Sequence, residues 1–77
     1  MTDTIPVGKF MVAWWQFKEE DCWRLYDKPG NDSVGFTYTD AVTGDICFEM
    51  TGPLGLSSAI CRAIADFLDK LNEDTTP

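Results

Sequence analysis

The chain of 77 residues contains no histidine and only three cysteines, and these shortages exclude much of the usual catalytic chemistry. A serine or cysteine nucleophile commonly needs a histidine base, so a hydrolase site of that type is not expected. Cys22, Cys47 and Cys61 stand far apart without a Cys-x-x-Cys pair, and a structural zinc would need a carboxylate as its fourth ligand, which is uncommon. We therefore expect no enzyme, no catalytic residue, no metal site and no cofactor.

Positive charge is scarce as well, because six basic residues stand against thirteen acidic ones and leave a net charge of −7. Direct binding to nucleic acid is not expected, since such a protein neutralises phosphates with Lys and Arg. The longest apolar run, Phe10 to Trp15, is far too short to span a membrane, and no positively charged segment precedes it as in a signal peptide. We expect a cytoplasmic protein whose acidic surface either binds a basic protein surface or simply keeps the protein soluble.

Apolar residues are nevertheless abundant, at 44% with 13% aromatic, and this composition is typical of a folded domain rather than a disordered acidic tail. The length predicts a single domain over residues 1–77. Met1–Pro6 and Asn72–Pro77 are polar, so we expect both ends to fray and the ordered body to run from about residue 7 to residue 72.

Four segments have the composition of β-strands. The first, Gly8–Phe17, has a helix over Phe10–Tyr26 as its alternative, because that stretch lacks Pro and Gly. The tandem tryptophans and the polar turn that follows favour the strand. The other three strands are Cys22–Asp27, Val34–Thr39 and Ile46–Thr51. Short polar turns separate them, and the second and third of these contain glycine, as in an antiparallel meander.

The clearest element is an amphipathic helix from Leu56 or Ser57 to Leu71, whose apolar residues recur with helical spacing. Ser57 or Ser58 is expected to cap its start. The pattern predicts an α+β fold: a four-stranded antiparallel meander sheet with one C-terminal helix packed on one face, in the order ββββα. From the sheet, the predicted core takes Val12, Trp23, Leu25, Val34, Phe36, Tyr38, Ile46, Phe48 and Met50.

One helix covers one face of such a sheet, and we call the other face the open face. The first strand is apolar on both sides, so large apolar groups are expected on the open face whichever side is buried. Exposed patches of this kind mark interfaces, and aromatic residues supply much of the binding energy there. The expected aromatic binding residues are Trp14, Trp15 and Tyr26. The alternative is that loops or the N-terminal segment cover this face.

The meander also predicts where the charges gather. Two of its turns and the end of the helix are expected to lie at one end of the molecule, which we call the acidic end. Carboxylates at a helix C-terminus oppose the helix dipole, so stability alone does not favour this arrangement. The alternative is that the clustering is incidental. The residues concerned are Glu19, Glu20, Asp21, Asp40, Asp45, Asp69 and Glu73.

One short acidic chain with a sheet-plus-helix pattern and no catalytic residues resembles the small inhibitors made by phages and mobile elements, anti-CRISPR proteins in particular. The resemblance implies a non-catalytic inhibitor in a bacterial host that binds a CRISPR effector subunit and blocks its basic path for nucleic acid. An acidic immunity or antitoxin-type protein that neutralises a basic toxin is the first alternative. A structural or accessory subunit that oligomerises, for example as a homodimer, through the open face is the second.

Overall fold

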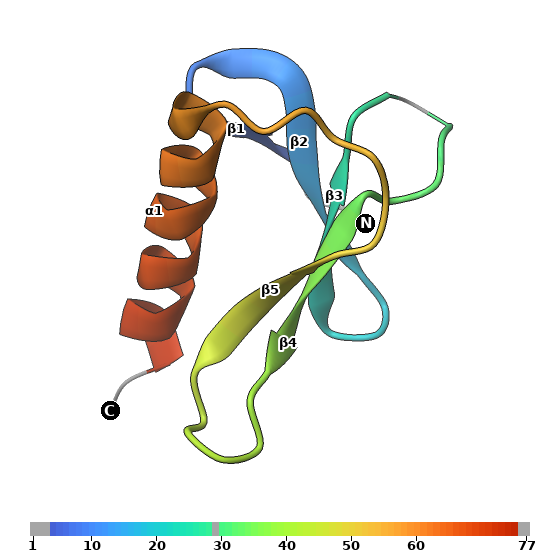
Figure 1. The fold of residues 1–77 in the computed structure, drawn as a ribbon. Coiled ribbons are helices and arrows are strands. Elements are labelled where there is room, and N and C mark those ends of the chain that lie inside the picture. The colour runs from blue at the N-terminus through green and yellow to red at the C-terminus, as the bar shows by residue number, and fades with distance from the viewer. Residues whose placement is uncertain (1–3, 29, 76–77) are drawn as a thin grey trace.

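The computed structural model describes residues 4–28 and 30–75, in which five strands precede one helix (Figure 1). Each strand pairs antiparallel with the next along the chain, in one sheet. The α+β class with a C-terminal helix is therefore confirmed. The elements are β1 (Thr4–Val7), β2 (Phe10–Lys18), β3 (Cys22–Tyr26), β4 (Gly35–Thr39), β5 (Ile46–Met50) and α1 (Ser58–Thr75).

The sheet has five strands rather than the expected four, because Thr4–Val7 forms a strand where the sequence predicted a frayed end. Pro6 pairs with Trp14 of β2. Proline donates no backbone N–H, but an edge strand tolerates it because one side of that strand has no neighbour. A tight turn joins β1 to β2, and Gly8 in this turn has a φ of 56°, which favours glycine. The first long strand therefore begins at Phe10 rather than at Gly8.

The helix is fixed at both ends by side chains. The Ser57 hydroxyl accepts a hydrogen bond from the N–H of Ile60 at 3.2 Å, which confirms a serine cap at the start of α1. The helix continues past the expected end at Leu71. Near its C-terminus, the Asn72 side chain accepts a hydrogen bond from the N–H of Ile46 at 2.7 Å and donates one to the C=O of Ile46 at 3.1 Å. The C-terminal part of α1 is thereby held against the start of β5.

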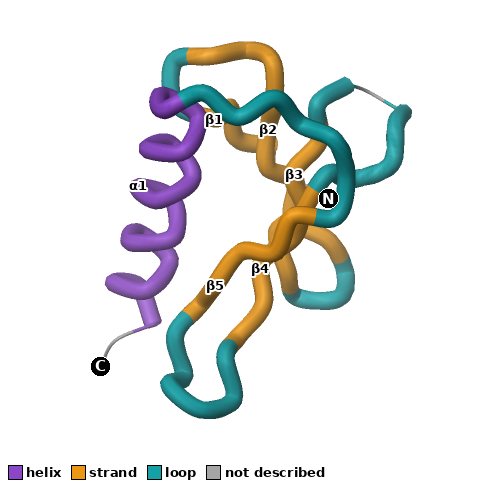
Figure 2. The backbone as a smooth tube through the Cα atoms, viewed as in Figure 1, coloured by secondary structure: helices purple, strands orange, loops and turns teal. Residues whose placement is uncertain are grey.

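The core lies between α1 and one face of the sheet, and Trp15 is among its largest fully buried side chains. The Trp15 ring stacks on Phe67 of α1 with centroids 4.5 Å apart, and it meets Phe48 of β5 edge-on at 5.3 Å. The loop over residues 51–57, teal in Figure 2, leads from the sheet to α1, and Leu54 in it packs against this core. Of the nine core residues predicted from the sheet, four belong to it, namely Trp23, Leu25, Val34 and Phe48.

The prediction for β4 was wrong, because the expected inner and outer sides of this strand are exchanged. Val34 and Gly35 are both buried although they are adjacent, so the alternation of sides shifts by one residue where β4 begins. Thr37, only 4% exposed, consequently faces the core. Phe36 and Tyr38, which were expected in the core, belong to the open face.

Two further residues predicted for the core are exposed. Val12 is 55% exposed, because Ala13 and Trp15 of the same strand face α1 and Val12 has the opposite phase. Met50, at the last position of β5, is 36% exposed. Since β2 is apolar on both sides, its composition did not reveal which side the helix covers.

Candidate binding surface

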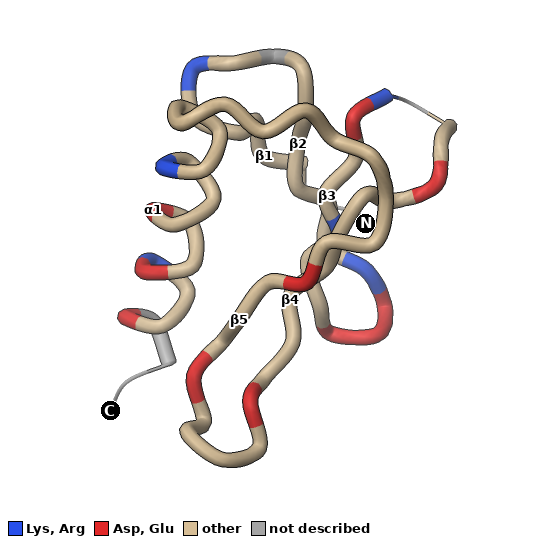
Figure 3. Tube along the Cα trace, viewed as in Figure 1, with Lys and Arg blue, Asp and Glu red and all other residues tan. Residues whose placement is uncertain are grey.

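The three segments that carry the candidate acidic residues lie at the same end of the molecule (Figure 1). They are the β2–β3 turn, the β4–β5 turn and the C-terminal part of α1, and Figure 3 colours the described Asp and Glu residues of these segments red along the backbone. The turns of an antiparallel meander alternate between two ends, and the hydrogen bonds between Asn72 and Ile46 bring α1 to the β4–β5 turn. Of the seven carboxylates, Asp40 is half-buried and the others are exposed.

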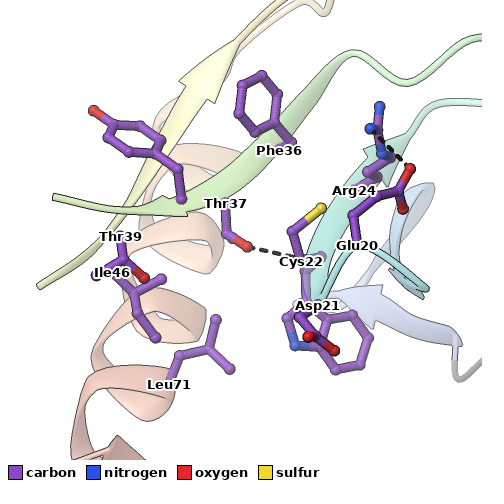
Figure 4. Close-up of a pocket in the computed structure, with 11 residues that line it drawn as sticks. Glu20, Asp21, Cys22, Arg24, Phe36, Thr37, Thr39, Ile46 and Leu71 are labelled. Atoms are coloured by element: carbon purple, nitrogen blue, oxygen red, sulfur yellow. Dashed lines mark hydrogen bonds and ion pairs between the residues drawn. The ribbon is translucent and has the colours of Figure 1, made fainter. Parts of the chain in front are cut away.

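A cleft of about 400 Å³ lies at the acidic end, between the β2–β3 turn, the start of β5 and the C-terminal part of α1. Glu20 and Asp21 line it from the β2–β3 turn, Ile46 lines it from β5, and Leu71 lines it from α1. Figure 4 shows Ile46 and Leu71 on one side of the cleft and the β2–β3 residues on the other. The acidic end is therefore a hollowed surface with both acidic and apolar walls.

The cleft lies where β3 and β4 separate. Two residue pairs join these strands, whereas five pairs join β2 to β3 and five join β4 to β5. The ladder stops at Arg24, and the N–H of Trp23 donates to the hydroxyl of Thr37 at 3.0 Å. The side chain of Thr37 therefore takes the place of a backbone acceptor, and the sheet opens toward the acidic end.

Little of the negative charge at this end is neutralised internally. The described residues form one ion pair, in which Arg24 contacts Glu20 at 3.5 Å with the Glu20 side chain 61% exposed. Asp40 accepts a hydrogen bond from the N–H of Val42 at 2.7 Å, which fixes the β4–β5 turn without a counter-charge. Most of the charge at the acidic end is thus available to a positively charged partner.

Two of the three predicted aromatic binding residues lie together on the open face. Trp14 of β2 and Tyr26 of β3 are cross-strand partners, and their rings stack with centroids 5.9 Å apart and an angle of 22°. The ammonium group of Lys18 lies 5.3 Å from the centroid of the Tyr26 ring, within the range of a cation–π contact. Both rings are partly exposed, so this pair offers a rigid aromatic surface.

Two more aromatic residues, which sequence reasoning missed as surface residues, extend this group along β4. Phe36 pairs with Arg24 of β3, so both point to the open face, and Tyr38 on the same side is 45% exposed. Small residues alternate with large aromatic ones in Gly35–Thr39. That pattern identifies the aromatic side of the strand, but it is compatible with an aromatic side turned inward or outward.

The third predicted aromatic residue does not belong to a binding surface. Trp15 is 1% exposed and is enclosed by Phe48 and Phe67. Neighbouring residues of a strand point to opposite sides, so Trp14 and Trp15 cannot share a face of the sheet. Trp15 is therefore a core residue, and its place in the expected binding set was wrong.

The three cysteines all belong to the described residues. Cys22 and Cys47 are partly buried, Cys61 is exposed, and all three are free thiols. Within residues 4–28 and 30–75, no group of three or more Cys, Asp or Glu is arranged to hold a metal ion. In the same part of the chain, no helix combines the length and the apolar character of a bilayer-spanning segment.

Comparisons with protein-family models, with curated proteins and with solved structures each returned no match.

Proposed function

We propose that the protein is a non-catalytic inhibitor that binds a basic surface of another protein, one that normally holds nucleic acid. The observation that supports this most is the meeting of two surfaces. Exposed carboxylates from three segments gather at the acidic end, and two aromatic residues of the open face, Phe36 and Tyr38, line the same cleft as Glu20 and Asp21. Surface charge alone can serve solubility, and single exposed apolar residues are common on proteins. Together, the two surfaces match the polar rim and the aromatic centre of a typical interface.

The two surfaces would act at different stages of binding. The acidic end attracts a Lys- and Arg-rich groove over a distance and raises the association rate, an effect that weakens as salt rises. Once the proteins meet, Trp14 and Tyr26 lose water and supply contact area with little loss of side-chain freedom. Nucleic acid and the inhibitor would then compete for the same cations.

The short length, the acidic charge and the sheet-plus-helix pattern favour one form of this function, an inhibitor of the anti-CRISPR type. Such a protein would bind a subunit of a CRISPR effector and cover its path for nucleic acid. An immunity or antitoxin-type protein would use the same chemistry against a basic toxin. The identity of the partner separates these two forms, because one partner is an RNA-guided complex and the other is a toxin.

A second candidate function, that of a subunit assembling with its own copies, is favoured by the exposure of Val12 and Tyr38 on the open face. Light scattering of the purified protein tests it directly. A stable oligomer that dissociates when Tyr38 is changed to serine would favour assembly. A monomer at the concentrations used for binding would favour the inhibitor.

The test of the proposed inhibitor is capture of partners from a bacterial lysate on the tagged protein, followed by binding measurements with the purified partner. The informative variant is Glu19→Lys with Glu20→Lys at the acidic end. The matched control is Asp27→Lys with Asp32→Lys, which changes the net charge equally at the opposite end, where both residues line another cleft.

We expect a nucleic-acid-binding partner whose affinity falls about tenfold or more in the Glu19/Glu20 variant and much less in the control. Nucleic acid should displace the protein, and binding should weaken as salt rises. Equal losses in the two variants would show that only net charge matters. Retained affinity in the Glu19/Glu20 variant would contradict the proposed role of the acidic end.

A further inference from the structure

The two edge strands of the sheet, β1 and β5, differ in what protects their outer backbone groups. On β1, Pro6 removes one backbone N–H, and proline is a common means of protecting an edge against added strands. On β5, the amide of Asn72 bonds to both the N–H and the C=O of Ile46. A side chain that bonds in this way stands in for one residue of a neighbouring strand. Asn72 therefore occupies a single position of the β5 edge.

The bonds to Asn72 also reveal the direction of the other backbone groups of β5. The N–H and C=O of Ile46 point away from β4, because Asn72 reaches them from α1. Along an antiparallel strand this direction repeats every second residue. The N–H and C=O of Phe48 and Met50 consequently point outward too, toward the free edge of the sheet.

A groove of about 610 Å³ lies beside this edge, between β5 and α1. Phe48 of β5 and Ile64 and Leu68 of α1 provide apolar walls, and all three are at least partly buried. Asp45 and Asp69, both exposed, line the groove toward the acidic end. The groove thus combines backbone hydrogen-bonding groups, an apolar wall and negative charge.

We infer that β5 receives an extended basic segment of the partner protein as a sixth strand of the sheet. This inference rests on the proposed function and deepens it, because it names the part of the partner that is bound. Alternate apolar side chains of the segment enter the groove, while basic side chains between them face Glu49 on the open face. A further basic residue of the segment, beyond the apolar ones at the acidic end, approaches Asp45 and Asp69. A second copy of the chain fits less well, since both copies carry a net charge of −7.

The experiment titrates the isotope-labelled protein with a short acetylated peptide of alternating valine and lysine, observed by NMR. We expect the largest shifts at the amides of Phe48 and Met50 and along the groove side of α1. Antiparallel addition makes valine the residue opposite Phe48, so N-methylation of the valines should weaken binding about tenfold or more. N-methylation of the lysines should leave binding nearly unchanged, because their N–H groups point away from β5.

Matched protein variants locate the binding. Ala65 is exposed and lines the groove, so Ala65→Trp fills it and should abolish the shifts. Lys70→Trp, also at an exposed position of α1 but outside the groove, should leave them intact. Equal effects of both N-methylated peptides, or shifts confined to the open face, would overturn the inference. Concentration-dependent shifts at β5 without peptide would overturn it in favour of a second copy.

The inference and the proposed function can fail separately. If the peptide does not bind β5 but the Glu19/Glu20 variant still loses the captured partner, the strand addition is wrong and the inhibitor stands. If Ala65→Trp blocks the peptide but the captured partner ignores both charge variants, the β5 site stands without the proposed inhibitor.

Discussion

The two faces of the sheet contain similar aromatic residues in different surroundings, and the adjacent Trp14 and Trp15 illustrate the contrast. Trp15 lies under α1, stacked on Phe67, and is 1% exposed. Trp14 lies on the open face, where it stacks on Tyr26 and remains partly exposed. The contrast teaches that the side of the sheet decides whether an aromatic residue is buried in the core or left at the surface. A shift of one position along the strand changes that side.

The largest expected effect concerns the covered face. Trp15→Ala should lower the free energy of unfolding by about 3–5 kcal/mol, because it leaves a large cavity against Phe48 and Phe67. A domain of this size has little more than that in total, so the variant should be largely unfolded. Urea unfolding followed by circular dichroism measures the loss. Val12→Ala, on the open side of the same strand, is the control and should cost well under half as much; equal losses would remove the contrast between the faces.

A smaller loss is expected at the closest approach within the covered face. A Cβ on Gly35 would overlap the ring of Phe48 and lie 2.8 Å from the carbonyl oxygen of Glu49. Gly35→Ala should therefore cost about 1–3 kcal/mol through overpacking. Gly55, around which a Cβ would meet nothing within 4 Å, provides the matched Gly→Ala control. Thermal unfolding of both variants checks the prediction, and a loss at Gly55 as large as that at Gly35 would contradict it.

The smallest expected effect has the opposite sign and concerns the acidic end. α1 has no basic residue in its last turn, and Glu73 there faces the negative end of the helix dipole. Glu73→Gln should raise the free energy of unfolding by a few tenths of a kcal/mol at low salt, and the gain should vanish at high salt. Glu49→Gln, remote from the helix end, should show no such gain. A loss of stability in the Glu73 variant would mean that the acidic end supports the fold.

Local patterns predicted the fold class, the four longer strands and the helix. The helix has a clear period, and each strand has a strand-forming composition and lies next to a polar turn. β1 was missed because it is short, contains Pro6 and gains its order from pairing with β2. The faces of β4 were exchanged because two adjacent residues, Val34 and Gly35, are both buried. Tertiary packing decides such a shift, and the pattern of apolar residues does not record it.

The placement of the acidic residues followed from topology alone, since the turns of a meander alternate between two ends. The cleft between β3 and β4 could not be foreseen in the same way. It depends on where their ladder stops and on the hydrogen bond from Trp23 to Thr37. The aromatic part of the surface was predicted for Trp14 and Tyr26 and missed for Phe36 and Tyr38. The sequence of β4 has its aromatic residues on one side, and this pattern fits a strand whose aromatic side faces either the core or the solvent.

The most direct test of the account measures stability and partner affinity together in the variant Trp14→Ala. We predict that its free energy of unfolding falls by no more than about 1 kcal/mol, since the ring is only partly buried and stacks on one neighbour. Its affinity for the captured partner should fall about tenfold or more. Unchanged affinity, or a loss of stability comparable to that of Trp15→Ala, would contradict the division of the sheet into a folding face and a binding face.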